Sequence, residues 1–189
     1  MPVLYYVRHG ETDFNRQGRL QGRRDTPLNA HGRQQAAECG VLLRDLFARD
    51  HRQAQDFKYV SSPLKRARET MEILRATLGL QVDDYEIDAR LIEIAYGEWE
   101  GLTLQEIEMR NASVLSARER DKWDFAPPGG ESYRELADRK LVQLAHRRHR
   151  GRGARGRCTR ADGDLKHRVR ERSDACTDRA GRRLCFCER

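Results

Sequence analysis

Near the start of the chain, a histidine lies between an arginine and a glycine in "RHGETDFN", residues 8–15. A neutral imidazole carries an unshared electron pair near neutral pH, so His9 could act as a nucleophile. The Arg8 guanidinium offers paired donors that match phosphate oxygens, and Gly10 would let backbone N–H groups approach an anion closely. Alone, the triplet would fit a packed histidine at a strand end equally well.

Two later segments supply groups that complete a phosphoryl-transfer chemistry. "SSPLKRARET" contains Arg66, which competes for a phosphate-binding role with Lys65 and Arg68, and "LIEIAYGEWEG" contains Glu93. Two guanidiniums can neutralise a transferring phosphoryl group as metal ions do elsewhere, and a carboxyl group can protonate the leaving oxygen and then activate water. We find no credible ligand cluster in residues 1–139, so we expect no metal and no cofactor.

Apolar runs and helical spacings indicate the elements that must position these residues. They predict strands at 3–7, 57–62 and 85–94 and helices from Asn29, after Pro63 and after "GGES". Strands separated by long helices favour an α/β fold, a three-layer sandwich around a mostly parallel sheet. Ligands of such sheets bind at the carboxyl ends of the strands, where His9, Arg66 and Glu93 follow.

Five ordered segments resemble the histidine phosphatase superfamily, the phosphoglycerate mutase-like proteins, over residues 1–139. They are "VRHGETDFN", "GRLQGRRDTPLNAHGRQQA", "SSPLKRARET", "LIEIAYGEWEG" and "PPGGESYRELADR". The resemblance implies that His9 is the phosphorylated nucleophile, that Arg8 and Arg66 bind the phosphate, and that Glu93 donates the proton. It also implies that Asn15, Gln21 and Gly22 line the phosphate or substrate site, to which Gly10 is added on its own chemistry.

The resemblance to the short members of this family favours a phosphatase of small phosphorylated metabolites. True mutases have a long insertion after the glutamate motif, whereas only a short segment separates Tyr96 from "GGES" here. Two alternatives stay open, namely mutase-type phosphoryl transfer and a non-catalytic phospholigand binder with a basic arm for nucleic acid. No leader-like or membrane-spanning run is apparent, so we expect a cytoplasmic protein with no membrane partner. The sequence leaves the oligomeric state open.

The composition changes abruptly near residue 140. Residues 1–139 contain 21 Lys and Arg against 24 Asp and Glu, whereas residues 140–189 contain 16 against 6 and have no Ile, Met, Trp or Tyr. We therefore expect a phosphatase-like domain at 1–139 and a poorly ordered basic tail at 140–189. Because no aromatic residue precedes Phe186 in the tail, we do not expect nucleic-acid binding. The spacing of Cys158, Cys176, Cys185 and Cys187 does not favour a zinc site.

The tail also lacks a motif that the resemblance implies, a second histidine in an apolar strand followed by two glycines. His146, His149 and His167 are the candidates, and none follows a strand-like run. Reading codons for residues 150–163 one base out of frame permits "VVVAHGGVARALM", an apolar strand that ends in this motif. We infer an out-of-frame translation that begins between Arg139 and Ala145, which would leave the chain as written weak or inactive.

Overall fold

The sheet of the molecule is parallel and four-stranded. The computed structural model describes residues 3–146 and 182–186. Its strands are β1 (Val3–Val7), β2 (Lys58–Ser61), β3 (Glu86–Ile87) and β4 (Arg182–Phe186). They lie in the order β1-β4-β2-β3, and every neighbouring pair is parallel. The predicted α/β class with a parallel sheet is therefore confirmed.

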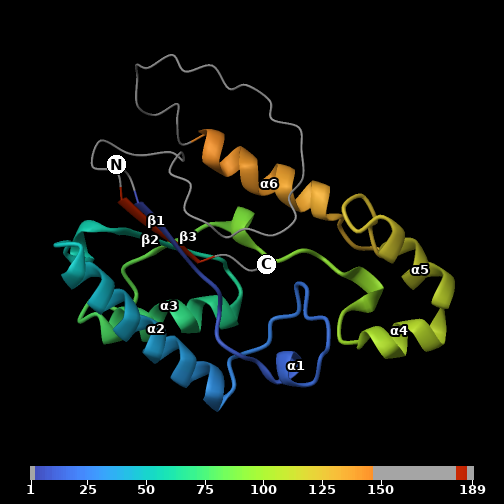
Figure 1. Cartoon of the computed structure of the whole chain (residues 1–189), viewed down its shortest axis with the longest axis horizontal. Coiled ribbons are helices and arrows are strands. Elements are labelled where there is room, and N and C mark those ends of the chain that lie inside the picture. The colour runs from blue at the N-terminus through green and yellow to red at the C-terminus, as the bar shows by residue number, and fades with distance from the viewer. Residues whose placement is uncertain (1–2, 147–181, 187–189) are drawn as a thin grey trace.

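Helices cover both faces of this sheet (Figure 1). The long helices α2 (Ala30–Arg49) and α3 (Lys65–Thr77) pack together on one face, and α6 (Tyr133–His146) lies on the other. Helices α4 (Leu104–Arg110) and α5 (Ala112–Arg120) stand to one side of these layers. The short elements are α1 (Asp13–Arg16) and the 3-10 turns η1 (Ala54–Asp56), η2 (Ala89–Leu91) and η3 (Gly97–Trp99).

Side-chain caps fix where the main helices begin. The Asn29 side chain accepts a hydrogen bond from the Gly32 N–H at 2.8 Å, so α2 begins where the sequence predicts. At the start of α6, the Ser132 N–H donates to Glu135 Oε2 at 2.7 Å and the Glu135 N–H donates to Ser132 Oγ at 3.2 Å. This reciprocal pair explains the helix expected after "GGES".

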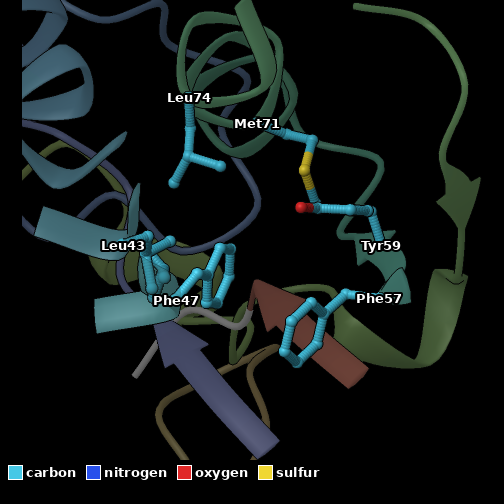
Figure 2. Packing of buried hydrophobic residues seen from close by; sticks show 7 residues of the cluster. Leu43, Phe47, Phe57, Tyr59, Met71 and Leu74 are labelled. Atoms are coloured by element: carbon cyan, nitrogen blue, oxygen red, sulfur yellow. The ribbon is translucent and has the colours of Figure 1, made fainter. Parts of the chain in front are cut away.

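The core lies between the sheet and the α2/α3 layer. Figure 2 shows Met71 and Leu74 pointing from α3 toward the aromatic residues, and both are fully buried. Phe47 of α2 stacks on Phe57 with ring centroids 4.5 Å apart, and Tyr5 of β1 meets both rings edge-on. This packing holds β1 in place, and with it the two residues that follow the strand, Arg8 and His9.

The structure differs from the predicted elements in three places. The expected strand at 85–94 pairs only over β3, because Asp88 then caps the η2 turn by accepting the Arg90 N–H at 3.0 Å. Helices α4 and α5 were not predicted. A strand, β4, was also not expected in the basic tail. The remaining tail residues, 147–181 and 187–189, include the segment of the shifted-frame prediction and lie outside the described residues.

Candidate active site

His9 lies two residues beyond the end of β1 and has a defined tautomer. Its Nδ1 lies 2.6 Å from the Gly10 carbonyl oxygen. Because a carbonyl oxygen only accepts hydrogen bonds, Nδ1 carries the proton and Nε2 carries the unshared pair. Burial, together with the charges of Arg66 and Arg8, lowers the pKa of His9 to about 4 against the opposing effect of the Gly10 hydrogen bond. The imidazole is therefore neutral at pH 7, as a nucleophile requires.

Gly10 has a packing role that differs from the expected one. Its N–H donates to Thr70 Oγ1 at 3.1 Å, so this N–H does not point to a bound anion. A Cβ at this position would lie 2.2 Å from the Gly32 carbonyl oxygen, where the segment after β1 runs against the start of α2. The missing side chain thus lets two backbone segments come together beside His9.

Arg66 is fully buried in the first turn of α3. Its Nη1 donates to the Arg24 carbonyl and its Nη2 donates to the Gly22 carbonyl, each at 2.8 Å. Gly22 adopts a φ of 56°, a conformation that glycine reaches without strain. Lys65 and Arg68 are exposed. Among the three candidate cations of this helix start, Arg66 is therefore the one held in the interior.

A polar cluster lies next to residues 22–24. It consists of Thr12, Asn15 and Gln21. Thr12 is the N-cap of α1, and its N–H donates to Asn15 Oδ1 at 3.1 Å. Gln21 Oε1 accepts the Thr12 hydroxyl at 2.8 Å and the Thr26 hydroxyl at 2.5 Å. Since its oxygen serves these two hydroxyls, the amide nitrogen of Gln21 is the end that can donate to a ligand.

Glu93 is buried and follows the η2 turn instead of a strand. Its Oε1 accepts the Ile94 N–H at 2.8 Å. Burial raises the pKa of Glu93, and the Ile94 N–H and the charges of Lys140, Arg66 and Arg8 oppose this effect without cancelling it. A carboxyl group in this environment keeps its proton to a higher pH than usual, which suits proton donation.

Charge effects link the four predicted catalytic residues. Arg8 and Arg66 each act on the pKa of both His9 and Glu93. The charges of the two arginines therefore influence both titrating groups, although the arginines follow different strands. Arg8 is exposed and Arg66 is buried, so one guanidinium faces solvent and the other is fixed within the protein.

Two residues that hold this site in place, Glu100 and Arg139, were not predicted from the sequence. Glu100 Oε1 accepts the Arg23 N–H at 2.8 Å and the Tyr96 N–H at 3.2 Å. These bonds join the loop of residues 22–24, which binds Arg66, to the chain after Glu93. Arg139 contacts the backbone around Glu93 from α6. Both residues occur within the quoted segments, but side-chain to backbone contacts of this range leave no periodic signal.

The described residues show neither a metal-binding cluster nor a membrane-spanning helix. Residues 3–146 and 182–186 contain no group of three or more His, Cys, Asp or Glu side chains arranged to hold a metal ion. Within the same residues, no helix has the length and apolar character needed to cross a bilayer.

Comparison with known proteins identifies the family. The model of the histidine phosphatase superfamily (branch 1) matches residues 4–155. The chain is 38% identical over 148 residues to the uncharacterized phosphatase PhoE of Bacillus subtilis, covering 77% of this chain and 64% of that protein. It is 37% identical over 150 residues to the probable phosphoglycerate mutase GpmB of Salmonella paratyphi C, covering 77% of this chain and 62% of that protein. The chain thus spans less than two thirds of these relatives.

A solved structure supports the same conclusion. The mycobacterial glucosyl-3-phosphoglycerate phosphatase in complex with VO3 superposes with a TM-score of 0.70 at 27% identity, covering 100% of this chain and 76% of that one. The relatives are named as phosphatases and as phosphoglycerate mutases, so the family handles phosphoryl groups. On these matches, the chain belongs to the histidine phosphatase superfamily.

Proposed function

We propose that this chain derives from a metal-independent phosphatase of small phosphorylated metabolites that works through a phosphohistidine at His9. The observation that carries the proposal is the state of this imidazole. The Gly10 carbonyl fixes its tautomer, burial keeps it neutral, and the charges of Arg8 and Arg66 act on it. These are the conditions under which a histidine attacks a phosphate ester.

In the first step, the Nε2 pair of His9 attacks phosphorus and the bond from phosphorus to the leaving oxygen breaks. The buried carboxyl group of Glu93 gives its proton to that oxygen, so the product leaves as an alcohol. Arg8 and Arg66 stabilise the charge on the phosphoryl oxygens during the transfer. The imidazolium formed on His9 keeps its Nδ1–H directed at the Gly10 carbonyl.

In the second step, the Glu93 carboxylate takes a proton from a water molecule, and the oxygen of that water attacks phosphorus. The bond from phosphorus to Nε2 breaks, and its electron pair returns to His9. Inorganic phosphate leaves, and both groups regain their starting protonation states. The relatives named as phosphatases and the VO3 complex of one of them support hydrolysis at this site.

We also propose that the tail results from a shifted reading frame and impairs the chain as written. No His-Gly-Gly follows Arg139 in the sequence. The strand between β1 and β2 is instead Arg182–Phe186, "RRLCF", whereas central parallel strands are usually continuous apolar runs. The nucleotide sequence across codons 135–165 tests this point. A gene with no inserted or deleted base in this region, compared with related genes, would contradict it.

The function is tested by turnover of p-nitrophenyl phosphate. The assay compares the chain as written, a frame-restored chain and the His9→Ala variant of each. We expect the frame-restored chain to be the fastest and both His9→Ala variants to lose turnover. Equal rates for all four proteins would refute the assignment, and transfer between phosphoglycerates without release of phosphate would favour the mutase alternative.

A further inference from the structure

Arg139 of α6 binds the backbone that carries Glu93. Its Nη1 donates to the carbonyls of Arg90 and Ile92 at 2.7 and 2.8 Å, and its Nη2 lies 3.3 Å from the Glu93 carbonyl. The side chain is only 19% exposed. One guanidinium thus serves three carbonyls of residues 90–95, which we call the Glu93 segment.

Glu131 holds Arg139 in this position and binds the same segment from its other end. Its carboxylate accepts Arg139 Nε at 3.0 Å and Nη2 at 2.9 Å. The backbone N–H of Glu131 donates to the Ala95 carbonyl at 2.8 Å, and the Ala95 N–H donates back to Glu131 Oε2 at 3.3 Å. Burial alone would raise the pKa of Glu131, but Arg139, the Ala95 N–H and Arg23 hold it below its usual value. The Glu131 carboxylate is therefore ionised at neutral pH.

The Glu93 segment needs such support because the sheet does not provide it. Strand β3 ends at Ile87, so the carbonyls of Arg90, Ile92 and Glu93 have no strand partner in the described pairing. Hydrogen bonds from the Arg139 guanidinium to these carbonyls take the place of hydrogen bonds to a neighbouring strand. Hydrogen bonds from charged donors are stronger than those from neutral donors. The direction of the Glu93 carboxyl therefore depends on the position of Arg139.

The same pair is linked to the loop that Arg66 binds. Arg23 Nε donates to the Glu93 carbonyl and its Nη2 pairs with Glu131 Oε2, each at 3.4 Å. Its neighbours Gly22 and Arg24 offer their carbonyls to Arg66. Through Arg23, Glu131 thus connects the Glu93 segment with the loop whose carbonyls bind Arg66.

We propose that Glu131 and Arg139 are positioning residues that aim the Glu93 carboxyl at the leaving oxygen by fixing the Glu93 segment. This inference rests on the proposed function of Glu93. Neither side chain contacts a reacting atom in this account, so both act through the backbone of residues 90–95.

The first test uses the leaving group as the reporter. A p-nitrophenolate leaves without a proton, whereas an alkoxide needs one, so loss of proton donation slows alkyl phosphates selectively. In the frame-restored chain, we expect Arg139→Gln to lower kcat/KM for β-glycerophosphate by about 10- to 100-fold and kcat/KM for p-nitrophenyl phosphate by less than about threefold. The ratio kcat/KM reports the transfer to His9 and not the later hydrolysis of the phosphohistidine, in which Glu93 acts for both substrates. An equal loss on both substrates would mean a merely structural role and would overturn the proposal.

Two further variants separate the possible failures. Arg134→Gln is the matched control, since Arg134 lies on the same helix and pairs with Asp124 but contacts no carbonyl of residues 90–95. It should leave both rates unchanged. Glu93→Gln should show the same leaving-group selectivity as Arg139→Gln. If Glu93→Gln lowers kcat/KM for both substrates equally, the assigned proton donation by Glu93 fails; if only Arg139→Gln lacks the selectivity, the positioning role alone fails.

The second test requires no turnover and uses the chain as written. The carboxyl of Glu93 is titrated by 13C NMR and identified by its loss in Glu93→Gln. The groups that face this carboxyl are kept in both proteins that are titrated: Arg8, Arg66, Tyr96 and Lys140. We expect Arg139→Gln to lower the pKa of Glu93 because the released segment becomes hydrated. An unchanged titration in a variant that keeps its circular dichroism spectrum would overturn the proposal, and Arg139→Lys replaces the glutamine variant if that one unfolds.

Discussion

Protonation of His9 should weaken the folded state in a defined pH range. Burial holds the pKa of His9 at about 4, whereas an unfolded histidine titrates near 6.5. Between these values the unfolded chain binds more protons than the folded one, so the free energy of unfolding falls as the pH falls from about 7 to about 4. The difference between the two pKa values corresponds to about 3 kcal/mol at the acid end of this range.

Urea unfolding of the chain and of His9→Gln at several pH values between 4 and 7 measures this contribution. Between pH 7 and pH 4, we expect the free energy of unfolding of the unaltered chain to fall by about 3 kcal/mol relative to that of His9→Gln. His51→Gln, which removes an exposed histidine, is the control and should run parallel to the unaltered chain. Parallel curves for His9→Gln and the unaltered chain, or an NMR titration of His9 near 6.5, would refute the buried neutral imidazole.

Three further outcomes follow from the same contacts. Arg66→Met should lower the free energy of unfolding by about 3 kcal/mol, because the buried Gly22 carbonyl and the partly buried Arg24 carbonyl lose their charged donors; a loss below about 1 kcal/mol would contradict this. Gly10→Ala should cost about 1–3 kcal/mol in urea unfolding, since its Cβ would lie 2.2 Å from the Gly32 carbonyl oxygen; an unchanged midpoint would show that the two segments can separate. Turnover by the frame-restored chain should not change with EDTA, and a loss that a divalent metal restores would exclude the metal-independent mechanism.

The sequence allows part of the site to be predicted because its signals are local. His9 follows an apolar run that forms β1, and Arg66 lies on the inner face of a helix whose apolar spacing is regular. Both positions follow from periodicity and from the rule that ligands bind beyond the carboxyl ends of parallel strands.

The surroundings of Glu93 could not be predicted in this way. The apolar alternation of residues 85–94 is typical of a strand, yet Asp88 caps a turn and Arg139, far along the chain, binds the carbonyls that a strand would use. The pairing of β4 with β1 and β2 was also hidden, since "RRLCF" has the composition of a charged tail. These features depend on contacts between distant residues, which no single segment encodes.

The central claim is that the phosphoryl group passes through His9, and trapping the intermediate tests it most directly. The frame-restored chain is mixed with p-nitrophenyl phosphate, quenched in alkali, where a phosphohistidine survives, and digested for mass spectrometry. We predict one phosphoryl group on the peptide that contains His9, and none in His9→Ala. A phosphoryl group on any other residue, or undiminished hydrolysis by His9→Ala, would contradict the account.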